Sequence, residues 1–175
     1  MSEHLEGHPP AYERIRSKKT LAEILQVATE FERKACQFYS ALIPKVRKHI
    51  RYLVEELAAE EKAHYERFQR LAEDPEVQQQ IQARIQAPVE DHRFSDYIHL
   101  PEFGENPDDQ AILQYALGRE DAAMKQYREL AHSVPEGPIR QLFDFLADEE
   151  TQHKRELEKT YYELVFGGGR MVPRV

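Results

Sequence analysis

The sequence has 175 residues but only one cysteine, Cys36, and no tryptophan. A lone cysteine excludes an internal disulfide framework, and it excludes an iron–sulfur cluster or four-cysteine iron site built from this sequence alone. No run of about 18 apolar residues occurs, so no transmembrane helix is expected. The first ten residues are polar and lack the apolar stretch of a secretory signal, so we expect a reducing, cytoplasmic location.

Basic residues are also scarce relative to acidic ones. There are 24 lysines and arginines against 32 aspartates and glutamates, which gives a formal charge of −8. A phosphate backbone needs a clustered basic surface, so nucleic acid is not expected as the main partner. The acidic excess can be solvated helix surface or metal ligand, and the position of each acid decides between the two.

Glycines and prolines are few and lie at boundaries, and between them apolar residues recur every three to four positions. This period is typical of amphipathic helices, and no segment alternates with the period of a strand. Four long helices are predicted, over 20–43, 48–71, 107–132 and from the turn at 133–138 to 166. Thr20 and Glu23 have the spacing of a capping box, and Pro107 suits a first helical turn.

The stretch 73–109 differs from these helices because it holds four prolines and one short glutamine-rich segment at 78–86. It is long enough to run the length of a bundle, which a simple hairpin turn would not require. The predicted fold class is therefore all-α, a ferritin-like antiparallel four-helix bundle of two helical hairpins joined by a long crossover. We expect one domain over 20–166, preceded by a flexible segment 1–19 and followed by a flexible tail 167–175.

Six residues interrupt the apolar stripes of the four helices with ionisable side chains. A buried carboxylate is costly unless it is paired or binds a metal ion. These residues are the candidate metal ligands: Glu32, Glu61, His64, Glu120, Glu150 and His153.

The spacing of these residues repeats between the two halves of the chain. Glu61 and His64 are three apart, as are Glu150 and His153, so each pair lies on one helix face. The segments 57–64 (LAAEEKAH) and 146–153 (LADEETQH) share five of eight residues. Each Glu-x-x-His follows a helix with one inward glutamate, and antiparallel hairpins would place all six side chains in one layer.

Less specific interpretations stay open for several residues. A single Glu-x-x-His is typical of a solvated helix face, and Cys36 fits a small buried apolar residue better than a redox sensor. Glu60 and Glu149 each precede a candidate ligand and are expected to face solvent or a neighbouring helix, or to be the ligand if the register slips by one. The remaining histidines have no partner at metal spacing and are expected at the surface: His4, His8, His49, His92, His99 and His132.

With the motif Glu-x-x-Ala-x-x-x-Tyr present at 32–39 and 120–127, and with both Glu-x-x-His pairs, the sequence resembles the rubrerythrin branch of the ferritin-like superfamily over 20–166. The resemblance implies that the six candidates bind two iron ions, with manganese or zinc as competitors. It also implies that Tyr39 and Tyr127 steady the carboxylate ligands through their hydroxyls; packing in the core is the alternative for both tyrosines.

The sequence departs from the family pattern in two places. Rubrerythrins commonly carry an additional glutamate three residues after the ligand of the third helix, where this chain has Ala123. Full-length rubrerythrins also carry a four-cysteine iron domain, which one cysteine cannot form. The resemblance therefore implies reduction of hydrogen peroxide or dioxygen with electrons from an external donor protein, in a homodimer. The alternatives are a ferroxidase or iron-handling protein, and a non-catalytic metal-dependent interaction module.

Overall fold

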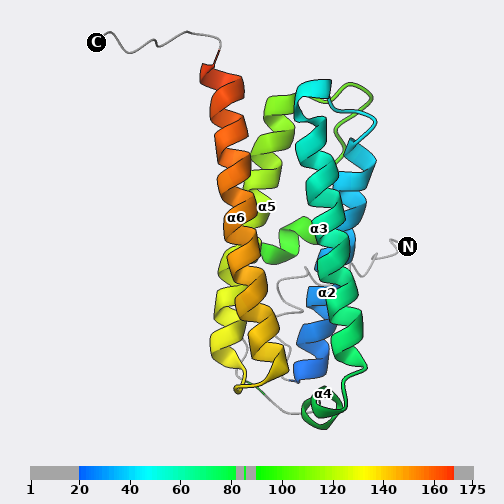
Figure 1. Cartoon of the computed structure of the whole chain (residues 1–175), viewed down its shortest axis with the longest axis vertical. Coiled ribbons are helices and arrows are strands. Elements are labelled where there is room, and N and C mark those ends of the chain that lie inside the picture. The colour runs from blue at the N-terminus through cyan, green and yellow to red at the C-terminus, as the bar shows by residue number, and fades with distance from the viewer. Residues whose placement is uncertain (1–19, 82–84, 86–89, 168–175) are drawn as a thin grey trace, which may run out of the picture.

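The computed structural model describes residues 20–81, 85 and 90–167, and no β-strand is found among them. Four long helices form the molecule (Figure 1), and a short helix and a 3-10 helix lie in the connection between the second and third. In chain order the elements are α2 (Leu21–Leu42), α3 (Lys48–Ala72), α4 (Pro75–Gln80), η1 (Phe94–Ile98), α5 (Asp109–Ser133) and α6 (Pro138–Phe166).

The helices pair as two antiparallel hairpins, α2 with α3 and α5 with α6. In Figure 1, α3 ends at the lower end of the bundle and α5 begins at the upper end, so the connection 73–108 runs the length of the molecule. The all-α class and the two hairpins joined by a long crossover are as predicted.

The long helices agree with the predicted ranges to within two residues at each end. Thr20 forms the expected capping box: its hydroxyl accepts from the Glu23 amide, and the Glu23 carboxylate accepts from the Thr20 amide, both at 3.3 Å. The prediction for Pro107 was wrong, because α5 begins at Asp109. Asp108 caps that helix by accepting the Gln110 amide at 2.8 Å, and an aspartate cap fixes the helix start more strongly than the proline before it.

The crossover contains an element that periodicity did not predict. In η1, Phe94 is fully buried and stacks on Phe31 of α2 at 3.9 Å between ring centroids. On the α5 side, Tyr97 lies directly over Gly118, where any side chain would meet the Tyr97 hydroxyl. The crossover therefore packs against both hairpins. Of the glutamine-rich segment, α4 includes 78–80, and residues 82–84 and 86 lie outside the described residues.

The apolar core is divided into two clusters along the bundle. One gathers residues from the beginning of α2, the end of α5 and the beginning of α6, including Phe31, Tyr127 and Phe143. The other gathers residues from the end of α2 and the beginning of α5, including Phe38 and Leu113. The polar layer described below lies between them.

The predictions for 1–19 and for 168–175 fall outside the described residues. Among the residues that are described, no helix combines the length and apolar character needed to cross a membrane.

Candidate metal centre

All six candidate ligands lie together in the middle of the bundle, each no more than 2% exposed. Their ligand atoms form two groups in which every atom is within 4.8 Å of the others. The first group consists of Glu32, Glu61, His64 and Glu150, and the second of Glu61, Glu120, Glu150 and His153. Glu61 and Glu150 belong to both groups, so two carboxylates are shared and each group adds one glutamate and one histidine of its own.

Several of these buried atoms make no hydrogen bond. The unpartnered atoms include both oxygens of Glu61, one oxygen each of Glu32 and Glu150, and Nδ1 of His64. Buried polar atoms are almost always satisfied, so a set of orphaned acceptors converging on one place calls for a cation. Carboxylate oxygens and imidazole nitrogens suit iron, manganese or zinc, and the residues present therefore fit a metal centre.

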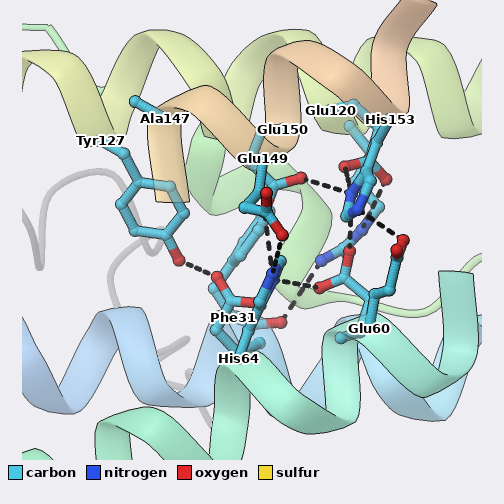
Figure 2. A network of polar contacts seen from close by, with 12 residues as sticks. Phe31, Glu60, His64, Glu120, Tyr127, Ala147, Glu149, Glu150 and His153 are labelled. Carbon is cyan, nitrogen blue, oxygen red and sulfur yellow. Dashed lines mark hydrogen bonds and ion pairs between the residues drawn. The ribbon is translucent and has the colours of Figure 1, made fainter. Parts of the chain in front are cut away.

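The two histidines face the cluster through the same ring atom. His64 Nδ1 lies 3.4 Å from Glu32 and 3.5 Å from Glu150, and His153 Nδ1 lies 3.1 Å from Glu150 and 3.6 Å from Glu120. The two rings stack at 5.6 Å between centroids with 19° between their planes. His64 comes from α3 and His153 from α6, so the two hairpins meet through these rings (Figure 2).

The outer nitrogen of each histidine faces a carboxylate from the opposite hairpin. His153 Nε2 is 2.7 Å from Glu60, and His64 Nε2 is 4.0 Å from Glu149 (Figure 2). The sequence left open whether Glu60 and Glu149 face solvent, face a neighbouring helix or are themselves ligands. In the structure both face a neighbouring helix. Glu60 is close enough to accept the Nε2 proton of His153, and this favours the tautomer that leaves Nδ1 free to bind a metal ion. Glu149 faces His64 Nε2 from beyond hydrogen-bond distance.

Two tyrosines reach the carboxylates across the bundle. Tyr39 of α2 donates its hydroxyl to Glu120 of α5, and Tyr127 of α5 donates to Glu32 of α2. Both tyrosines are fully buried, and burial raises the pKa of each hydroxyl well above its usual value. They therefore remain protonated donors, and each holds one glutamate oxygen while the other oxygen faces the centre.

Without a metal ion, the acids and bases of the centre hold protons in unusual places. Burial, followed by the charge of Glu150, raises the pKa of Glu120 to about 7 and that of Glu61 well above its usual value. Burial also acts to raise the pKa of Glu150, but the hydrogen bond with Glu120 and the charge of His153 hold it well below the usual value. Burial alone would lower the pKa of both histidines, yet the surrounding carboxylates raise it.

Among the charged residues of the core, sequence reasoning missed Arg119. It precedes Glu120 on α5 and is only 1% exposed. Arginine is expected at surfaces, so the inward-facing stripe of α5 was predicted to include Ala116, Glu120 and Ala123 but not Arg119. Its position, three after Ala116 and four before Ala123, was the available signal that this arginine also faces inward.

The remaining predictions for individual residues gave mixed results. Cys36 was expected to be buried, but it is only half-buried, with Sγ 4.0 Å from the Ser40 hydroxyl, because it lies at the edge of the α2 stripe. His99 and His132 are exposed, and His92 is half-exposed. His49 is 51% exposed and lies 3.5 Å from the buried Asp109, a pairing that was not anticipated. His4 and His8 lie outside the described residues.

Comparison with known proteins agrees with this geometry. The sequence profile of the rubrerythrin family matches residues 23–99 and 111–168, which is more than half of the chain. The chain belongs to the rubrerythrin family. The match extends over all four long helices and includes the six candidate ligands.

A crystal structure also resembles this bundle. It is that of a protein from Thermotoga maritima assigned as a ferritin-like diiron-carboxylate protein, with a TM-score of 0.69 and 19% sequence identity. The alignment covers 83% of this chain and 97% of that one. At this identity the likeness establishes the ferritin-like fold. No curated protein sequence matches the chain significantly.

Proposed function

We propose that this rubrerythrin-family chain is a non-haem di-iron oxidoreductase that reduces hydrogen peroxide or dioxygen with electrons from an external donor protein. The observation that carries the proposal is the pair of buried ligand groups sharing Glu61 and Glu150. Two iron(II) ions, when bound, supply one electron each to a peroxide or dioxygen molecule. Manganese and zinc suit the same ligands and are the competitors to test.

The proposed reduction of hydrogen peroxide consumes only electrons and protons, and no atom of the protein is transferred to the products. Cleavage of the O–O bond takes up two electrons and two protons and releases two molecules of water. The described residues include one half-buried cysteine and no cluster of thiols, so we place the source of electrons in a separate protein.

The protein's own part in this chemistry is to hold ligands and protons at fixed atoms. Glu61 and Glu150 lie where they can contact both metal positions, and Glu32 and Glu120 each serve one. Tyr39 and Tyr127 keep their protons and fix one oxygen of Glu120 and Glu32. Fixed donors in a dry site cost no reorganisation when charge moves during the reaction.

The test is peroxide consumption by the iron-loaded protein in the presence of a small artificial one-electron donor. We expect many peroxide molecules to be reduced per chain in the wild type, and loss of turnover to background in Glu61→Gln. Glu55→Gln is the matched control, since Glu55 is exposed on the same helix two turns away. Equal rates for the wild type and Glu61→Gln would contradict the proposal.

The same experiment separates the alternatives. A ferroxidase would oxidise added iron(II) and retain it without any need for the donor. A metal-dependent interaction module would do neither. We also propose a homodimer in the cytoplasm, and the mass in size-exclusion chromatography distinguishes a dimer from the large cage that iron storage would need.

A further inference from the structure

Arg119 is the one lysine or arginine that is fully buried among the residues the structure describes. Its guanidinium stacks on the Phe31 ring at 4.2 Å and lies 6.0 Å from the Tyr39 ring. Its two terminal nitrogens contact the backbone carbonyls of Phe31 and Tyr97 at 3.4 and 3.5 Å, which are long hydrogen bonds. An unpaired buried charge is strongly disfavoured, so this arginine needs a partner of opposite charge.

That partner is the carboxylate cluster as a whole rather than one ion pair. Nε of Arg119 makes no hydrogen bond and lies 3.9 Å from the Glu120 oxygen that already accepts from Tyr39. Burial acts to lower the pKa of Arg119, but the charges of Glu61 and Glu120 raise it above its usual value. An arginine guanidinium does not lose its proton in proteins, so Arg119 is a cation beside the metal ligands whether or not the site is loaded.

The charges inside the loaded centre then do not cancel. The four buried glutamates balance two divalent ions, and histidines bind metal in the neutral form. The charge of Arg119 is left over. Glu60 and Glu149 lie on the outer side of the histidine rings with side chains 40% exposed, so water screens them more than it screens the buried arginine.

We propose that Arg119 sets how tightly the loaded centre holds one small monoanion, whose charge completes the neutrality of the buried cluster. Azide is a suitable probe, and hydroperoxide is the anion of the same class that the proposed substrate yields by releasing one proton to the solvent. The inference rests on the part of the proposed function that places two divalent ions in the site. It does not depend on turnover.

The test compares Arg119→Met, which fills a similar volume without charge, with Arg119→Lys, which keeps the charge and loses the planar group. Arg67→Met is the matched control. Arg67 stacks on Phe145 at the same 4.2 Å, but it is exposed. Each protein is loaded with cobalt(II), a divalent ion with a visible spectrum, and titrated with azide; metal affinity is measured separately by competition with a chelating indicator.

Removing the charge should shift the two affinities in opposite directions. In Arg119→Met we expect azide to bind at least about tenfold more weakly and cobalt(II) about tenfold more tightly, because a buried cation attracts the anion and repels the metal. Arg119→Lys should stay close to the wild type in both, and Arg67→Met should change neither.

A purely structural role gives a different pattern. Loss of the stacking and carbonyl contacts would weaken metal and azide binding together, and the lysine variant would share the defect. That pattern, or an unchanged azide affinity in a fully loaded Arg119→Met, would overturn the inference and leave the proposed function intact. Failure of the wild type to take up two ions would overturn both.

Discussion

At the scale of single residues, the centre depends on side chains that orient the ligands as much as on the ligands themselves. Beside each ligand group lie a tyrosine hydroxyl and one carboxylate that is not among the six ligands, both from the opposite hairpin. In the group with His64, Tyr127 donates to Glu32 and Glu149 faces the histidine ring; in the group with His153, Tyr39 donates to Glu120 and Glu60 pairs with the histidine. The twofold repeat in the sequence thus extends beyond the six ligands.

Replacing Tyr127 with phenylalanine should weaken the metal position that contains Glu32. The variant keeps the packing of the ring but removes the hydroxyl that holds one oxygen of Glu32. Loss of such an orienting partner typically lowers metal affinity about 10–100-fold. Zinc titration against a chelating indicator measures the change.

Tyr115→Phe is the control for this variant, because the Tyr115 hydroxyl on the same helix donates to the His99 carbonyl, away from the ligands. We expect its zinc affinity to match the wild type. Equal affinities in Tyr127→Phe and Tyr115→Phe would show that the hydroxyl on Glu32 does not orient the ligand.

Metal binding should release protons and should become tighter as the pH rises. The pKa of Glu120 is raised to about 7 and the pKa values of Glu61 and both histidines are raised, so the metal-free centre holds protons that the metal must displace. A group that loses a proton on binding makes affinity increase with pH up to its pKa. Calorimetry at pH 6, 7 and 8 in two buffers of different ionisation enthalpy should therefore show proton release and an affinity that rises through this range. No release would contradict the assignment of these acids.

At the scale of elements, the four helices could be predicted from sequence because each buries one continuous stripe. The ligands were visible because Glu and His occupy positions where that stripe calls for an apolar residue. Arg119 lies at a stripe position too, but its spacing did not outweigh the expectation that an arginine lies at the surface, because a sequence shows neither the carboxylates that offset its charge nor the crossover carbonyl that it contacts. η1 is also irregular and five residues long, too short for any period to be detected.

The crossover should contribute strongly to stability through η1. Phe94 is fully buried, stacks on Phe31 and meets the edge of Tyr127, so it links the crossover to both hairpins. We expect Phe94→Ala to lower the free energy of unfolding by about 3–5 kcal/mol, the usual cost of a buried Phe→Ala cavity. Chemical denaturation of the metal-loaded protein measures this change.

Leu100→Ala is the control for the same segment, since Leu100 is 43% exposed two residues after η1. Its effect should stay within about 0.5 kcal/mol, as for most surface substitutions. A comparable loss in both variants would mean that the crossover is not anchored through Phe94.

At the scale of the whole molecule, the two apolar clusters are separated by a layer in which four buried glutamates outnumber one buried arginine, Arg119, and the excess negative charge must be offset by metal ions or protons. Four buried glutamates come from four different helices, so their repulsion acts between the hairpins. The ferritin-like bundle therefore couples metal binding to the packing of its halves. The family to which the chain belongs fits this arrangement.

Removing the metal should lower the thermal stability of the protein. A ligand that binds only the folded state stabilises it by about 2.7 kcal/mol at 100 times its dissociation constant, for each site. For a chain of this size we expect the melting temperature to fall by at least about 5 °C after chelation. Differential scanning calorimetry of iron-loaded and chelated protein measures it, and equal melting temperatures would argue against a metal centre in the core.

The central claim is that six residues from four helices hold two metal ions between the hairpins. The most direct measurement is anomalous scattering from crystals of the iron-loaded protein at the iron edge. We expect two peaks per chain, both contacted by Glu61 and Glu150, one also by Glu32 and His64, and the other by Glu120 and His153. A single peak, or peaks on other residues with these six side chains uncoordinated, would contradict it.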